Sequence, residues 1–126
     1  MIVKKILEKI KNMQTEVVTN SNGTAVKFAD GTMICTLNIA VTDQAIDTKY
    51  GDISLYYKTR DWTFPVAFTE RPSVVCSMFK WGTSGSWGGV YSINSNASAT
   101  LIGYDFYSRA AGTTVNISAI AIGRWK

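Results

Sequence analysis

Apolar residues near the start of the chain recur with the period of an amphipathic helix. From Val3 to Val17 they are spaced alternately three and four residues apart, and good helix formers such as Lys, Leu, Glu and Gln lie between them. This spacing is the a/d pattern of a coiled coil, and isoleucine at both an a and a d position favours three or more chains over two. The expected trimerisation seam consists of Val3, Ile6, Ile10, Met13 and Val17.

Two arrangements of this helix are compatible with the sequence. About two heptads are too short for a stable isolated helix, so the apolar stripe needs a partner. The helix either lies on its own domain or joins other copies of the chain. The stripe is narrow, lysines flank it, and the pattern stops abruptly at the polar segment 19–23. We therefore expect residues 1–20 to form a trimeric coiled-coil stalk and residues 21–126 to form a separate head.

After residue 23 the hydrophobic period changes to two, which is typical of half-buried strands. The segments 24–29 and 32–41 flank Asp30-Gly31, a dipeptide that favours a type I′ hairpin turn. The second arm is expected to turn one apolar face toward the core, made of Met33, Cys35, Leu37, Ile39 and Val41. Cys35 and Cys76 both lie in apolar strand-like runs, and we expect two buried, reduced thiols rather than a disulfide.

Further short strands are expected along the rest of the chain, at 53–59, 74–80, 90–94, 100–108 and 113–124. Segment 81–89 has four glycines in nine positions and is expected to be irregular. The last strand is apolar on both faces, which is typical of a strand in the middle of a sandwich or at a subunit interface. The sequence therefore predicts an all-β, antiparallel β-sandwich after the short helix.

Three blocks of the sequence follow one another in a recognisable order. They are Asn22-Gly23 with 27–35, the aromatic-proline block Trp62-x-Phe64-Pro65-x-x-Phe68-x-x-x-Pro72-x-Val74, and the ending 117–125. Together they resemble the tail-tip domains of phages that infect Gram-positive bacteria. The resemblance implies an H-type-lectin-like sandwich of about six strands, assembled as a parallel homotrimer. It also implies a virion protein at the tip of a tail fibre, joined to the rest of the fibre or to the baseplate.

In that family the tip recognises the host, so the resemblance implies a bacterial cell-surface glycan as the ligand, either a cell-wall polysaccharide or a teichoic acid. The segment 81–107 matches no motif of the family, and its candidate residues follow from chemistry alone. Sugar sites combine aromatic faces with groups that hydrogen-bond hydroxyls. The predicted ligand-binding residues are Trp81, Trp87 and Tyr91, with Asp105 and Tyr107 as secondary candidates on one strand face and Ser84 and Ser86 as nearby hydroxyls.

Two alternatives to this site stay open. In one alternative, one or both tryptophans fold inward and cap the sandwich, which leaves a structural tip for trimerisation or baseplate attachment without sugar binding. A weaker candidate cluster for ligand contact lies earlier in the chain, at Tyr56, Tyr57, Arg60, Asp61 and Trp62.

The composition argues against catalysis. The chain has no histidine, which excludes Ser-His-Asp and Cys-His nucleophiles and histidine metal sites. A glycoside hydrolase would need a carboxylate pair, but most carboxylates lie in expected turns, where they bind the backbone. Only Asp105 lies in an apolar run that could raise its pKa. We expect a binding protein with no catalytic residues, no cofactor and no metal ion.

The net charge of +4 changes this picture little. Four lysines against one glutamate lie within the first eleven residues, so most of the excess belongs to the expected helix rather than to a folded face. Nucleic-acid binding is therefore not expected. No apolar run reaches 18 residues, so membrane insertion is not expected either.

Overall fold

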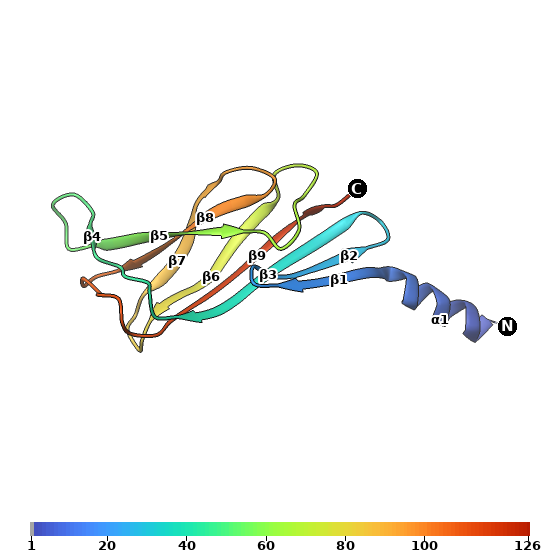
Figure 1. The fold of residues 1–126 in the computed structure, drawn as a ribbon, viewed down its shortest axis with the longest axis horizontal. Coiled ribbons are helices and arrows are strands. Elements are labelled where there is room, and N and C mark those ends of the chain that lie inside the picture. Colours follow the sequence, from blue (N-terminus) through green and yellow to red (C-terminus); the bar gives the residue numbers. More distant parts are fainter. Residues whose placement is uncertain (1) are drawn as a thin grey trace.

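A computed structural model describes residues 2–126. Within that range, one helix precedes nine strands that form two sheets (Figure 1). In chain order the elements are α1 (Ile2–Met13), β1 (Gln14–Asn20), β2 (Gly23–Phe28), β3 (Thr32–Val41), β4 (Thr48–Lys49), β5 (Tyr56–Thr63), β6 (Ser73–Trp81), β7 (Trp87–Ile93), β8 (Ser98–Asp105) and β9 (Val115–Arg124).

The two sheets confirm the predicted antiparallel β-sandwich. One has the strand order β1-β2-β3-β9-β6 and the other β4-β5-β8-β7, with antiparallel neighbours throughout. The strands number more than the six that the resemblance implied, partly because residues 14–20 and 48–49 add edge strands. No helix among residues 2–126 combines the length and the apolar character that crossing a lipid bilayer requires.

The core lies between the sheets and follows the alternation seen in the sequence. On β9 the side chains of Val115, Ile117, Ala119 and Ala121 are buried, while Ile120 and Ile122 point outward. On β3 the expected face of Met33, Cys35 and Leu37 is buried in the same way. The opposite sheet contributes inward residues of β8, including Ala99 and Leu101.

Two glycines let the sheets approach each other closely. A Cβ on Gly103 of β8 would overlap the ring of Phe79 on β6, and Phe79 is fully buried. A Cβ on Gly88 of β7 would lie 2.8 Å from the Cys76 sulfur. Glycine at both positions is therefore a packing requirement of this sandwich.

The prediction of two buried thiols is confirmed. Cys35 and Cys76 are both buried and form no disulfide. Burial raises the pKa of the Cys35 thiol to about 11 and also raises the pKa of Cys76. Both groups are therefore neutral at physiological pH, and burial limits their reactivity further.

The helix is shorter than expected. It ends at Met13, and residues 14–20 form strand β1, which pairs with β2 and places Val17 opposite Val26. The prediction that Val17 continues the helical seam, and that the helix extends to residue 20, was therefore wrong. β1 is rich in β-branched Thr and Val, which favour a strand, and pairing with β2 satisfies its backbone.

The structure describes only some of the remaining side chains of the predicted seam. Val3 and Ile6 are exposed on α1, which contacts mainly β1 and extends away from the sandwich instead of lying on it (Figure 1). The side chains of Ile10 and Met13 lie outside the described part of the structure. The trimeric coiled coil stays a prediction.

The hairpin turn also differs from the prediction. Gly31 has φ = 99° and donates its N–H to the Phe28 carbonyl (3.0 Å), but Asp30 does not have a positive φ. A type I′ turn needs two residues with positive φ, so this prediction was wrong. The Asp30 carboxylate instead accepts a hydrogen bond from the Thr32 N–H (2.9 Å), which stabilises a turn in which Asp30 keeps a negative φ.

Candidate functional site

Aromatic side chains gather on the outer face of the β4-β5-β8-β7 sheet, which we call the aromatic face. Tyr104 of β8 pairs with Tyr57 on the neighbouring strand β5 and with Trp87 on the other neighbour, β7. The neighbouring residues Gly103 and Asp105 face the core, so alternation turns these three rings outward. The Trp87 ring stacks on Tyr104 with centroids 5.6 Å apart and also packs against Phe106 at 5.3 Å. Trp87 was expected in an irregular loop but begins strand β7.

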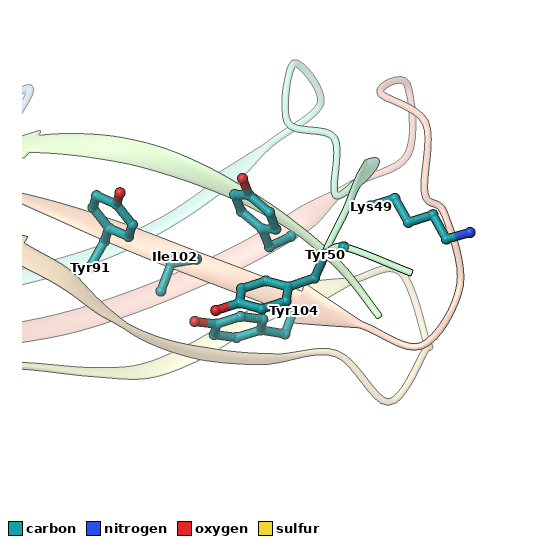
Figure 2. A pocket seen from close by; sticks show the side chains of 7 residues that line it. Lys49, Tyr50, Tyr91, Ile102 and Tyr104 are labelled. Atoms are coloured by element: carbon teal, nitrogen blue, oxygen red, sulfur yellow. The ribbon is translucent and has the colours of Figure 1, made fainter. Parts of the chain in front are cut away.

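The same face is hollowed beside this row of rings. The cavity has a volume of about 390 Å³ and is lined by Lys49, Tyr50, Gly51, Tyr57, Tyr91, Ile102 and Tyr104. We call it the tyrosine hollow. Figure 2 shows Tyr91 on one side, Ile102 in the middle, and Tyr50 and Tyr104 together on the other side. Ile102 is buried and forms an apolar floor, whereas Tyr91 is 65% exposed.

A tight loop after β4 brings Tyr50 to this face. The Tyr50 N–H donates to the Leu55 carbonyl (2.8 Å), and the Ile53 N–H donates to the Tyr50 carbonyl (3.4 Å). Gly51 has φ = 60°, a conformation that glycine adopts without strain. The loop sets the Tyr50 ring edge-on to Tyr57, with centroids 5.7 Å apart and planes at 70°.

The other predicted ligand residues, Trp81, Asp105 and Tyr107, each contact Arg109. The Arg109 guanidinium carbon lies 4.8 Å from the Trp81 ring centroid and 5.3 Å from that of Tyr107, and its Nε donates to Asp105 (3.2 Å). The backbone of Arg109 exchanges two hydrogen bonds of 2.9 Å with buried Ile46. The Trp81 indole donates to the Ala110 carbonyl (2.8 Å). We call Trp81, Asp105, Tyr107 and Arg109 the arginine cluster.

Asp105 is buried at the centre of the arginine cluster. Its carboxylate accepts hydrogen bonds from the Ser84 and Ser86 hydroxyls (2.7 Å each) and from the Tyr107 N–H (2.9 Å). Burial alone would raise the pKa of Asp105, but the hydrogen bonds from Ser84, Tyr107, Ser86 and Arg109 outweigh it and lower that pKa. The idea that the apolar run would raise this pKa was therefore wrong, and the two serine hydroxyls already bind within the protein.

The structure thus divides the predicted ligand residues into two groups. Trp87 and Tyr91 lie on the aromatic face, whereas Trp81, Asp105 and Tyr107 belong to the arginine cluster. β8 ends at Asp105, so Tyr107 lies beyond the strand and is exposed, rather than sharing a strand face with Asp105. Whether any of them binds a ligand stays a prediction. Among residues 2–126, no group of three or more His, Cys, Asp or Glu side chains is arranged to hold a metal ion.

The lowered pKa of Asp105 gives the head a pH-dependent stability. A carboxyl whose pKa is lower in the folded than in the unfolded state stabilises the fold above the unfolded value, about 3.9, and this contribution disappears as the pH falls through the folded pKa. We expect Asp105→Asn to lower the free energy of unfolding at pH 7 by about 1–3 kcal/mol. The difference from the wild type should shrink as the pH falls from about 5 to 2.

Urea denaturation of both proteins across that pH range measures this difference. Asp52→Asn is a matched control, because Asp52 lies in an exposed turn. A difference between wild type and Asp105→Asn that stays constant with pH would contradict the role assigned to this carboxylate.

A second surface feature is an apolar patch on the outer face of the five-stranded sheet. Val75 of β6 pairs with Ile120 of β9, and Ile122 of β9 pairs with Ile34 of β3. Val75, Ile120 and Ile122 are exposed by 62%, 41% and 49%. We call the exposed apolar residues of this face the sheet patch: Val17, Val75, Met78, Ile120 and Ile122. Exposed apolar clusters of this kind mark interaction surfaces.

Sequence reasoning missed part of the aromatic face. Tyr57 was placed in a weaker cluster with Tyr56 and Arg60, and Tyr50 and Ile102 were not singled out. The sequence of β8 does contain a pattern that places Ile102 and Tyr104 on the outer face, because they alternate with the inward residues Leu101, Gly103 and Asp105. No comparable signal existed for Tyr50, because a turn and not a strand pattern places it.

Comparison with known proteins shows a related fold. No family model and no curated protein matches the chain. Among solved structures, a C-terminal fragment of the R1 pyocin fibre of P. aeruginosa superposes with a TM-score of 0.57 at 19% sequence identity. The match covers 86% of this chain and 28% of the fibre fragment, so the chain corresponds to less than a third of that fragment. At this identity the likeness concerns the fold.

Proposed function

We propose that this chain is the tip of a phage tail fibre and that it binds a bacterial cell-surface glycan as a homotrimer, which attaches the virion to its host. The observation that carries the proposal is the exposed aromatic face on a head whose fold resembles part of a pyocin fibre. The glycan would be a cell-wall polysaccharide or a teichoic acid. The proposed role is binding without catalysis.

The aromatic face supports glycan binding because its rings are both exposed and held in place. Trp87 is 40% exposed although it stacks on Tyr104, and Tyr91 is 65% exposed. Aromatic rings offer flat apolar faces to the C–H groups of a sugar ring, and tyrosine adds a hydroxyl that donates and accepts hydrogen bonds. Strands position these side chains more rigidly than a loop would.

Two unpartnered apolar surfaces support the homotrimer. The apolar side chains of α1 that the structure describes are exposed, including Ile2 at 74% and Ile6 at 52%, and the sheet patch is open to solvent. Three copies of the chain would cover both surfaces, since a heptad pattern with isoleucine at a and d favours trimers. The remainder of the fibre or the baseplate would then join at the end that carries α1.

Binding of fluorescently labelled protein to purified cell walls from a broad panel of Gram-positive and Gram-negative bacteria tests this proposal. The wild type is expected to bind walls of at least one host. Trp87→Ala should weaken that binding by about 10-fold or more, because truncating an aromatic hot spot costs about 2 kcal/mol. Trp87→Ala should remain folded, since the ring is 40% exposed and packs on Tyr104 and Phe106 of the outer face.

Trp81→Ala is the comparison variant, because it tests the arginine cluster. We expect it to lower thermal stability by removing the contact with Arg109, and to leave wall binding intact while the protein is folded. If the wild type binds no bacterial wall, or if Trp87→Ala and Tyr91→Ala both bind as the wild type does, the proposed function is wrong.

A further inference from the structure

We propose that the tyrosine hollow binds one uncharged sugar ring of the glycan, an inference that rests on the proposed function. The structure offers four tyrosine rings, each from a different strand or loop, around one apolar floor. They are Tyr50 from the loop after β4, Tyr57 from β5, Tyr91 from β7 and Tyr104 from β8.

The size of the hollow fits a single saccharide unit. Its volume of about 390 Å³ lies at the small end of the range for ligand pockets, which is about 300–1,000 Å³. The hollow also opens onto the outer face of the sheet, so the rest of a polymer can leave it without a clash. A small, open site suits a repeating glycan that is bound one unit at a time by several heads.

The lining matches the two kinds of surface on a sugar ring. Ile102 and the tyrosine rings offer apolar contact for C–H groups. Each tyrosine hydroxyl can both donate and accept a hydrogen bond, as each sugar hydroxyl can. Tyrosine also loses little conformational entropy when it binds, because it has only two side-chain torsions.

The charges around the hollow favour an uncharged unit. Among residues 2–126 no carboxylate lines it, and Lys49 is the one charged residue that does. Figure 2 shows the Lys49 side chain directed away from the tyrosine rings. A phosphate or carboxylate placed among the rings would lose hydration without gaining a close positive partner, which is unfavourable. A hexose, deoxyhexose or N-acetylhexosamine carries no such penalty.

Aromatic contacts hold the walls of the hollow in place before a ligand arrives. The Tyr104 ring is stacked on Trp87, and the Tyr50 ring is set against Tyr57. Trp87 does not line the hollow, so toward the sugar ring in the hollow it is a positioning residue that acts through Tyr104, while its exposed ring stays free to contact the rest of the glycan. Walls that are already ordered reduce the entropy lost on binding.

The experiment is a titration of the full chain, labelled with ¹³C in its tyrosine rings, followed by NMR. The probes are the methyl glycosides of glucose, galactose, mannose, rhamnose, N-acetylglucosamine and N-acetylgalactosamine, compared with glycerol phosphate and methyl glucuronate. We expect at least one uncharged glycoside to shift the Tyr91 and Tyr104 ring signals, with an affinity that does not change with salt.

Variants locate the binding. Tyr104→Phe and Tyr91→Phe should each weaken it by several-fold, whereas Tyr107→Phe, an exposed tyrosine in the arginine cluster, should not. Gly89→Leu should abolish it, because a Cβ at Gly89 points at Ile102 from 3.6 Å and a longer side chain would cover the floor. That contact is ordinary, so the melting temperature of Gly89→Leu should stay close to that of the wild type. Trp87→Phe should restore most of the binding lost in Trp87→Ala.

Two results would overturn the inference. One is that no uncharged glycoside shifts the tyrosine signals. The other is that glycerol phosphate or methyl glucuronate binds best and depends on Lys49. If the wild type binds bacterial walls but the hollow variants bind equally well, the inference fails while the proposed function stands. If glycosides bind in the hollow but no bacterial wall retains the protein, the proposed function fails instead.

Discussion

Replacement of Gly103 by alanine is expected to lower the free energy of unfolding by about 3 kcal/mol or to prevent folding altogether. Gly103 faces the core from β8, and an added Cβ would overlap the ring of Phe79, which is fully buried. Close-packed interiors resist even one added methyl group. Chemical denaturation followed by circular dichroism measures the effect.

Two comparisons make this prediction specific. Gly89→Ala, on the paired strand β7, adds the same methyl group at an ordinary contact distance of 3.6 Å from Ile102 and should be nearly neutral. Adding Phe79→Leu to Gly103→Ala should recover part of the lost stability by shortening the obstructing side chain. Equal stability of Gly103→Ala and Gly89→Ala would show that the sheets can separate at little cost.

The second large effect concerns assembly. Val75→Asp combined with Ile120→Asp is expected to convert the proposed homotrimer into folded monomers. The two residues are register partners on the sheet patch, and a pair of carboxylates there would resist burial against a second copy. Each monomer should stay folded, because both side chains are already exposed within one chain. Loss of the proposed three-fold attachment should then reduce the proposed binding to host cells by about 10²–10⁴-fold.

Light scattering coupled to size-exclusion chromatography measures the assembly state. Ile53→Asp is a matched control, since Ile53 is 55% exposed but lies in the loop after β4, away from the sheet patch. The affinity of a single head for a monosaccharide should be unchanged in the double variant. A wild type that is already monomeric at micromolar concentration, or a double variant that stays trimeric, would contradict the interface.

Most of the sandwich was predictable because one face of each main strand is buried. Alternation on 32–41 and 113–124 specifies which residues point inward, and the structure follows it along β3 and β9. The stretch 14–20 was not predictable in the same way. Met13 and Val17 are four residues apart, which fits a helix, and only pairing with β2 reveals that the backbone there is extended.

The candidate site was harder to predict because it combines residues from separate elements. Trp81 and Trp87 are six residues apart, yet one ends β6 in the five-stranded sheet and the other begins β7 in the four-stranded sheet. Sequence proximity therefore grouped two tryptophans that the fold assigns to different surroundings. Tyr50 and Tyr91 are far apart in the sequence and come from opposite edges of the sheet β4-β5-β8-β7, and only the folded structure shows that they line one hollow.

The position of the C-terminal end makes it a suitable place to attach the protein to a surface. Trp125 donates its backbone N–H to the Gly31 carbonyl (2.9 Å) and its indole N–H to the Phe28 carbonyl (2.8 Å), which fixes the C-terminal end beside the β2–β3 turn. Helix α1 extends from the same end of the molecule, and the loop that carries Tyr50 lies at the opposite end (Figure 1). A sensor chip or bead coupled through a C-terminal tag would therefore hold every head with the loop that carries Tyr50 toward the sample and leave the outer face of the four-stranded sheet uncovered.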